Sequence, residues 1–238
     1  KQPQKNSFIT AIAWSDGHLE PILPRSILAV TSEKGQLAIY DFETKEKVTD
    51  FKFNDTIVSL MWCSFKHNRF YAGSRTGHFY ICEITDQKTI EILKVCDFVF
   101  KSSTEQVYKS IDYITQDDVK GHTVGIASND QLFGFITNVN DLEKMDLQLF
   151  HKNNMKEMYE KINFFEFYPN TEDFVTIATR SSSFFFSISK GTLVQFIESY
   201  YCKFVSFIDG ENDKVIIGND NEMNVWQLVD HFWVRIYN

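Results

Sequence analysis

The stretch "SEKGQLAIYD", residues 32–41, combines a polar turn with the pattern of a following strand. Ser32 opens the turn, Gly35 ends it, and the apolar residues Leu37 and Ile39 alternate with others up to Asp41. Alternation with a period of two is typical of a β-strand that is buried on at least one face. The stretch is therefore either one hairpin of an ordinary sheet or one copy of a repeated unit, and the rest of the chain decides between the two.

The same frame returns four more times along the chain. Each copy has a small residue, a polar turn and then apolar residues at the sixth and eighth positions. The copies are "SRTGHFYICE" at 74–83, "SNDQLFGFIT" at 128–137, "TRSSSFFFSI" at 179–188 and "GNDNEMNVWQ" at 218–227. A short apolar strand precedes each turn, and another apolar stretch closes each unit. The stretch at 32–41 is therefore one copy of a repeat.

A second signature lies upstream in each unit and has the form apolar-x-x-apolar-x-aromatic. Its five copies are Ile9/Ile12/Trp14, Ile57/Leu60/Trp62, Tyr108/Ile111/Tyr113, Ile162/Phe165/Phe167 and Cys202/Val205/Phe207. Successive turns are 42, 54, 51 and 39 residues apart, counted from 32 to 74, 128, 179 and 218. Units of four short antiparallel strands at this spacing predict the blades of a β-propeller.

We therefore predict an all-β fold in which residues 1–238 form a single β-propeller domain. The predicted blades cover residues 8–53, 57–96, 107–150, 161–198 and 201–237. A large meander or a β-sandwich is the alternative, but neither requires the same four-strand order five times. The 23 phenylalanines and 10 tyrosines favour β structure as well, because aromatic side chains pack well on a pleated surface.

The segment "SEKGQLAIYDFETKEK" resembles the end of a WD40 repeat. Tyr40-Asp41 stands where the family has Trp-Asp, and Trp226-Gln227 takes the same place in the fifth unit. No unit shows the family's Gly-His pair before its first strand, and only the first two turns keep a glycine, Gly35 and Gly77. The family's hydrogen-bond network is then incomplete, so we expect blade rigidity to come mainly from aromatic and aliphatic packing.

The resemblance implies a WD40-like propeller, and such propellers typically have seven blades. The five visible units leave three arrangements open: a five-bladed ring, a larger ring whose other blades lie outside this sequence, or a ring that a partner subunit completes. A WD40-type blade has a wedge angle suited to a larger ring, which favours the second and third arrangements.

Charge and cysteine usage limit the range of functions. The net charge of −8 disfavours direct binding to nucleic acid, which needs a positive surface. The four cysteines form no CxxC pair and have no histidine at zinc-finger spacing, as expected of buried residues in a reducing compartment. No apolar run reaches the length of a membrane span, and no leader pattern begins the chain. We expect an intracellular protein without a membrane segment.

Catalytic and metal-binding motifs are missing from the sequence. It contains no HExxH, GxSxG, P-loop or GxGxxG, and its six histidines are not paired at helical spacing. We therefore expect no enzyme activity, no metal and no cofactor. The alternative is a propeller hydrolase acting on glycans, for which Asp112 and Glu166 would be the pair of acids, because they take the same relative place on the innermost strands of their units.

Two groups of residues are candidates for contacts with a protein partner. The first lies in the turns that open the repeats: Arg75, His78 and Arg180. Loops on a rigid scaffold are common recognition sites, and arginine often anchors interfaces. A reader of a modified peptide at the channel mouth is a further alternative, and it would need an aromatic cage or a paired acid near Arg75 and Arg180.

The second group lies in two long connections between blades. "DFVFKSSTEQ" at 97–106 contains Phe98 and Phe100, and "HKNNMKEMYE" at 151–160 places Met155, Met158 and Tyr159 at helical spacing. Either these connections cover blade edges, or they dock another subunit through exposed aromatic and methionine side chains.

The sequence thus predicts a non-catalytic scaffold for protein–protein interactions. We expect a WD40-like subunit of an intracellular multiprotein complex, located in the nucleus or the cytoplasm, with other protein subunits as its partners. A nuclear assembly concerned with transcription, chromatin or ribosome production is the specific expectation.

Overall fold

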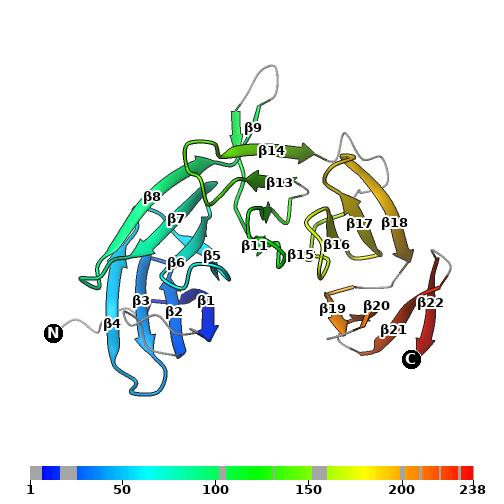
Figure 1. Cartoon of the computed structure of the whole chain (residues 1–238), viewed down its shortest axis with the longest axis horizontal. Helices are drawn as coiled ribbons and strands as arrows, with labels where there is room; N and C mark the ends of the chain where they lie inside the picture. The colour runs from blue at the N-terminus through cyan, green and yellow to red at the C-terminus, as the bar shows by residue number, and fades with distance from the viewer. Residues whose placement is uncertain are drawn as a thin grey trace. The chain divides into compact units, whose positions relative to one another are not determined.

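The computed structural model describes residues 7–16, 26–101, 106–130, 132–151, 160–198, 202–208, 211–219, 221–229 and 232–237. These residues contain β-strands and no helix. The strands form five four-stranded sheets and one two-stranded hairpin (Figure 1). In each four-stranded sheet the strands follow one another in chain order. The predicted all-β class and the unit of four strands are confirmed, and the five sheets are called blades 1 to 5 below.

The bounds of the strands are as follows. Blade 1 contains β1 (Ile9–Asp16), β2 (Ser26–Ser32), β3 (Gln36–Asp41) and β4 (Lys47–Lys52). Blade 2 contains β5 (Ile57–Trp62), β6 (Arg69–Ser74), β7 (His78–Ile84) and β8 (Ile90–Asp97), and the hairpin that follows pairs β9 (Val99–Lys101) with β10 (Gln106–Tyr108). Blade 3 contains β11 (Tyr113–Gln116), β12 (Val124–Ala127), β13 (Leu132–Thr137) and β14 (Asp146–His151). Blade 4 contains β15 (Phe164–Phe167), β16 (Phe174–Ala178), β17 (Ser182–Ser187) and β18 (Thr192–Glu198). Blade 5 contains β19 (Phe204–Ile208), β20 (Glu211–Gly218), β21 (Met223–Val229) and β22 (Phe232–Tyr237).

The chain divides into two compact units. Unit 1 is Lys1–Ile114 and holds blades 1 and 2, the hairpin and the first two residues of β11. Unit 2 is Thr115–Asn238 and holds the rest of blade 3 together with blades 4 and 5. That all five blades belong to one domain stays a prediction.

Glycine shapes the first two repeat turns. Gly35 has a φ of +73°, and a Cβ there would lie 2.3 Å from the carbonyl oxygen of Asp55. Gly77 has a φ of +88°, and a Cβ there would lie 2.9 Å from the carbonyl oxygen of Lys109. Each turn therefore needs glycine both for its backbone conformation and for its close contact with the chain that leads to the next blade.

The other three repeat turns close without glycine. The amide N–H of Ser128 donates to the carbonyl of Leu132 at 2.8 Å. In blade 4, Thr179 donates to Ser182 at 2.8 Å, and in blade 5 the amide of Asn219 donates to the carbonyl of Glu222 at 3.0 Å. These hydrogen bonds close the three turns, which explains how the repeat survives the loss of its glycine.

Blade 3 starts three residues later than its sequence signature indicates. The amide of Ile111 donates to the repeat turn of blade 2 at 2.9 Å, as Ile162 and Cys202 donate to the turns before them. Ile111 therefore opens the signature, whereas Tyr108 belongs to β10 of the hairpin. The interpretation of Tyr108/Ile111/Tyr113 as one signature was wrong, because the hairpin happens to supply an apolar residue at the same spacing.

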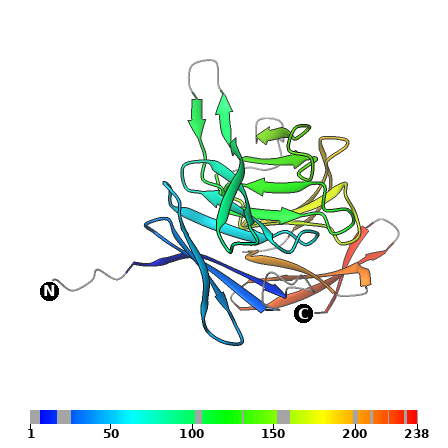
Figure 2. The same cartoon turned by 60° about the vertical axis from the view of Figure 1, so that its left-hand side comes forward.

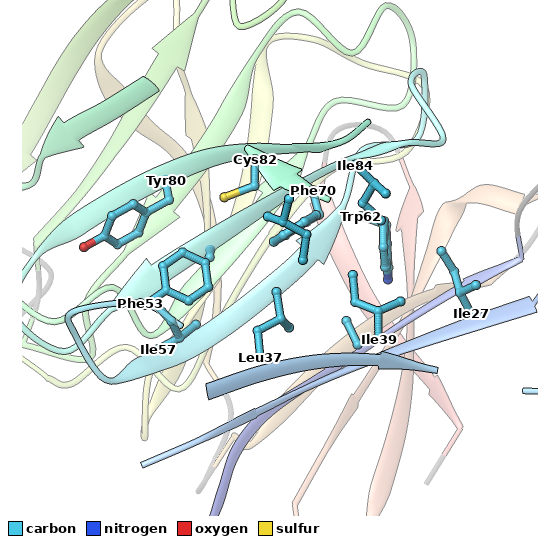
Figure 3. Packing of buried hydrophobic residues seen from close by; sticks show 13 residues of the cluster. Ile27, Leu37, Ile39, Phe53, Ile57, Trp62, Phe70, Tyr80, Cys82 and Ile84 are labelled. Carbon is cyan, nitrogen blue, oxygen red and sulfur yellow. The ribbon is translucent and has the colours of Figure 1, made fainter. Parts of the chain in front are cut away.

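The interior between blades 1 and 2 is mainly aliphatic on the blade 1 side and combines aromatic and aliphatic side chains on the blade 2 side. Figure 3 shows Leu37 and Ile39 of β3 directed toward the side chains of blade 2, among them Trp62 and Phe70. Leu37 and Ile39 are 1% exposed or less. Burying such side chains contributes about 2 kcal/mol each, so this interface holds the two blades together.

Phenylalanine dominates the interior of unit 2. The rings of Phe133, Phe135, Phe150 and Phe186 lie 4.9 to 6.0 Å apart between centroids. Most of these pairs are edge-to-face, the arrangement that aromatic quadrupoles favour. This cluster gives unit 2 the aromatic packing that the composition leads us to expect.

Within the part of the chain that the structure describes, no helix is long and apolar enough to cross a membrane. All four cysteines are free thiols, and Cys63, Cys82 and Cys202 are buried.

Candidate functional site

The repeat turns use their backbones to connect neighbouring blades. The carbonyl of Ser74 accepts the Ile111 amide at 2.9 Å, and the carbonyl of Arg180 accepts the Cys202 amide at 3.1 Å. Asn129 does the same for Ile162 at 3.2 Å. These hydrogen bonds join the turn of one blade to the chain that opens the next, so the turns are first of all part of the scaffold.

Arg75 and Arg180 nevertheless hold exposed positions in their turns. The amide of Arg75 donates to the carbonyl of Thr56 at 2.9 Å, and this bond fixes the backbone. Arg75 belongs to unit 1 and Arg180 to unit 2. Beside Arg180, the carboxylate of Glu160 accepts the amide of Ser181 at 2.6 Å and its hydroxyl at 2.9 Å. Partial burial tends to raise the pKa of Glu160. These bonds and the charge of Arg180 outweigh burial and hold the pKa below its ordinary value.

His78 lies between two carboxylates at the start of β7. Its Nδ1 is 3.2 Å from Asp55 Oδ2, and its Nε2 is 3.7 Å from Asp97 Oδ1. The rings of Tyr80 and Tyr108 lie near it, each with its centroid 6.1 Å from the imidazole. His78 therefore connects the entry to blade 2, its outermost strand and the hairpin, all within unit 1.

Asp55 is the centre of this group. Its carboxylate accepts hydrogen bonds from the side chain of Thr76 and the amide of Thr56, the latter at 2.7 Å. Burial tends to raise its pKa, but hydrogen bonds from Ser74, Thr76 and His78 outweigh burial and lower the pKa below the ordinary value. The partners all come from unit 1, and the group therefore has a structural explanation: it fixes the turn of blade 2.

The described part of the connection at 97–106 runs from the end of β8 into β9 and the first residue of β10. Phe98 is fully buried, and its amide donates to the carbonyl of Gly77 at 2.7 Å. It packs in the interior, so the prediction that Phe98 contacts a partner was wrong. Phe100 pairs with Val107 through the backbone. Figure 2 shows the hairpin projecting from the strands of blade 2.

The second predicted connection is only partly described. Met155, Met158 and Tyr159 lie outside the described residues, and their predicted role stays a prediction.

The two acids proposed for a glycan hydrolase do not occupy equivalent positions. Once Ile111 is taken as the start of the third signature, Glu166 corresponds to Thr115 and not to Asp112. Asp112 accepts a hydrogen bond from the hydroxyl of Ser110 at 2.8 Å. Burial raises the pKa of Glu166. The symmetry that suggested a catalytic pair is therefore lost.

One face of blade 1 was not among the predicted sites. Strand register places Trp14, Leu28 and Tyr40 in one row across the sheet, and Ile12 and Val30 in the next. Ile12 is 57% exposed, Trp14 is 42% exposed and Tyr40 is 37% exposed. Leu28 and Val30 are half-buried. We call these five residues the open face of blade 1.

Trp14 is held in place although it is exposed. Its ring contacts Phe42 edge-to-face, with 4.3 Å between the centroids. The ammonium group of Lys45 in turn lies 3.5 Å from the centre of the Phe42 ring, a cation–π contact. An exposed tryptophan that is already fixed loses little freedom when a partner covers it. The open face therefore has the features of a protein contact surface.

A signal for this face was present in the sequence. Residues 27–30, 37–40 and 11–14 are apolar at consecutive positions, so both faces of the sheet carry apolar side chains. Such a run indicates a strand that needs cover on both sides. The sequence alone cannot tell which side is left open.

Among the residues that the structure describes, no group of three or more His, Cys, Asp or Glu side chains is placed to hold a metal ion.

Comparison with known proteins supports the fold. No protein-family model matches the sequence, and no curated protein matches it either. Among solved structures, 1471 chains match, so the fold by itself does not select a function. One of them belongs to the crystal structure of the mitotic checkpoint complex, with a TM-score of 0.72 and 12% identity over 97% of this chain and 66% of that chain. The present chain thus spans less than two thirds of the length of that protein. Together with the five four-stranded sheets, this likeness gives the chain the fold of a WD40-like β-propeller.

Proposed function

We propose that this chain is a non-catalytic scaffold that binds other proteins within an intracellular multiprotein assembly. The observation that carries the proposal is the open face of blade 1, on which Ile12, Trp14 and Tyr40 are exposed together. Exposed apolar surface of this kind is stabilised when a partner removes it from water, at about 25 cal/mol per Å². A chain of the same fold occurs in the mitotic checkpoint complex, which also supports a place in an assembly.

The cellular setting is part of the proposal. We place the assembly in the nucleus, in transcription, chromatin or ribosome production, with protein subunits as partners and no direct contact with nucleic acid. The net charge of −8 supports the last point. Fluorescence imaging of the tagged protein tests the location: a purely cytoplasmic signal would contradict the nuclear part of the proposal and leave the scaffold itself intact.

The scaffold is tested by affinity purification of the tagged full-length protein from its native cells. The wild type is compared with Ile12→Glu, which places a charge on the open face, and with Lys34→Glu, which changes a charge in the exposed repeat turn of blade 1. We expect stoichiometric partner subunits with the wild type and with Lys34→Glu, and their loss with Ile12→Glu. Recovery of a monomer without partners from wild-type cells would contradict the proposal.

A further inference from the structure

A cavity of about 480 Å³ lies between the ends of β1 and β5, the innermost strands of blades 1 and 2. Both strands belong to unit 1. Trp14 and Trp62, which hold the same position in the signatures of the first two blades, both line it. Its volume falls within the range of about 300 to 1,000 Å³ that is usual for ligand sites.

The aromatic walls of the cavity are fixed by contacts that do not involve a ligand. The indole N–H of Trp62 donates to the carbonyl of Ala13 at 3.2 Å, so it ties the two strands together. The ring of Trp62 also packs edge-to-face on Phe70, with 5.4 Å between centroids. Trp14 is held by Phe42 as described above. A site whose walls are already ordered binds at a lower entropic cost.

The chemistry of the lining selects the kind of ligand. Among the described residues that line the cavity, none is Lys, Arg, Asp or Glu, so a phosphate or another strongly charged group would find no counter-charge there. The tryptophans and Met61 offer apolar and aromatic surface. Ser15, Ser64 and His67 add groups that can exchange hydrogen bonds with a peptide backbone. A sugar is a poorer match, since none of the described lining residues has a carboxylate or amide side chain.

The location connects the cavity with the open face of blade 1. Trp14 belongs to both, and the nearby Phe42 and Phe65 are also exposed. A partner that covers the open face can therefore place a neighbouring segment of its chain in the cavity.

We propose that this cavity binds one uncharged, ring-bearing side chain (proline, phenylalanine, tyrosine or tryptophan) presented by a linear peptide segment of a partner subunit. The inference rests on the proposed scaffold function and specifies how the partner is recognised. The apolar ring lies against Trp14 and Met61, and the peptide backbone meets the serine hydroxyls at the mouth.

The test pans a phage library of random linear peptides against the full chain. We expect the enriched peptides to share one uncharged ring-bearing residue. Their affinity should fall by about tenfold or more for Trp14→Ala and for Ser64→Arg, which places a long charged side chain at the exposed mouth. The matched control is Ser206→Arg, at an exposed serine of β19, which should leave the affinity unchanged.

Several outcomes would overturn the inference. They are the absence of any enriched peptide, an enriched motif whose shared residue is acidic or basic, and unchanged binding to Ser64→Arg. Thermal unfolding checks that each variant folds, and if Trp14→Ala does not, Ser64→Arg alone decides. Ile12 does not line the cavity, so loss of partners in cells with Ile12→Glu but not with Ser64→Arg contradicts the cavity inference alone. Peptide binding at the cavity by a protein that has no partner in cells contradicts the scaffold alone.

Discussion

The two faces of blade 1 are made of similar side chains but differ in their surroundings. On one face, Ala29, Leu37 and Ile39 are 1% exposed or less and pack against blade 2. On the other, Ile12 is 57% exposed and Trp14 is 42% exposed. The same three strands supply both faces, because successive side chains in a strand point to opposite sides. The repeat therefore gives both faces of blade 1 apolar side chains, whereas the exposure of each face depends on what packs against it.

This difference tells where function is to be sought. The repeat turns were the first candidates, yet their backbones are used in joining one blade to the next. The open face has no such task within unit 1. A surface that costs free energy when it is exposed calls for cover from outside unit 1, and the proposed scaffold function assigns this cover to a partner.

The largest expected effect compares two isoleucines of blade 1. Ile39→Ala removes a fully buried side chain and should lower the free energy of unfolding by about 3 kcal/mol, because it leaves a cavity against blade 2. Ile12→Ala on the open face should change it by less than about 0.5 kcal/mol. Urea denaturation followed by tryptophan fluorescence measures both. Equal losses would mean that the open face is covered in the isolated protein.

The next effect concerns the repeat turn of blade 1, which lies against the connection between blade 1 and blade 2. Gly35→Ala combines a positive φ with a Cβ placed 2.3 Å from the Asp55 carbonyl oxygen, and should cost about 2 kcal/mol. Gly191→Ala is the matched control, since its φ is +64° but its Cβ would be 3.5 Å from the nearest atom, in Phe150. It should cost about 1 kcal/mol, which is the conformational contribution alone. Thermal unfolding distinguishes the two, and a smaller loss at Gly35 than at Gly191 would show that the close approach does not matter.

A smaller effect depends on pH and involves Asp55, which lies in the connection between blade 1 and blade 2. The hydrogen bonds to its carboxylate lower its folded pKa, so the ionised form stabilises the fold above the unfolded pKa of about 3.9, and this stability is lost as the pH falls through the folded pKa. Asp55→Asn should therefore cost about 1 kcal/mol at pH 7, and the difference from wild type should shrink below about pH 4. Denaturation curves at several pH values measure it.

The control for this pH experiment is Asp50→Asn. Asp50 is exposed and pairs with Lys47 on the surface, so its replacement should have almost no effect at any pH. A pH profile for Asp55→Asn that runs parallel to wild type down to pH 3 would contradict the account of Asp55.

The smallest effect is one of reactivity and leaves stability almost unchanged. Cys82 lies on the blade 2 side of the interior between blades 1 and 2, and burial raises the pKa of its thiol to about 12. Cys96 is half-buried, with a pKa raised to about 11. Iodoacetamide at pH 8 should therefore modify Cys96 before Cys82, because only the thiolate reacts. Mass spectrometry of the digested protein reads out the order, and faster labelling of Cys82 would show that the interface opens readily.

Much of the fold could be predicted from residues at fixed spacing. Alternation around Leu37 and Ile39 locates strands, and Gly35 identifies the turn. Prediction failed where an insertion imitates the repeat: Tyr108 has the right spacing for the third signature, but belongs to the hairpin. Spacing cannot distinguish these cases, since the choice depends on the hydrogen bond that Ile111 makes to the preceding turn.

The candidate site was harder to predict from the sequence than the fold. Phe98 lies in a connection that was predicted to dock a partner, but its side chain is buried in the interior. Trp14 belongs to the apolar signature of a strand and resembles a core residue in the sequence, but its side chain is exposed. Burial depends on which segments lie against each other in three dimensions, and a single sequence without the fold does not contain that information.

The most direct test of the central claim is hydroxyl-radical footprinting of the open face in the free protein and in the assembly purified from cells. Trp14 and Tyr40 should be oxidised readily in the free protein and protected in the assembly, whereas buried Trp62 should be protected in both. Exposed Tyr108 on the hairpin serves as an internal reference. Equal oxidation of Trp14 and Tyr40 in the free protein and in the assembly would contradict the claim that this face binds a partner.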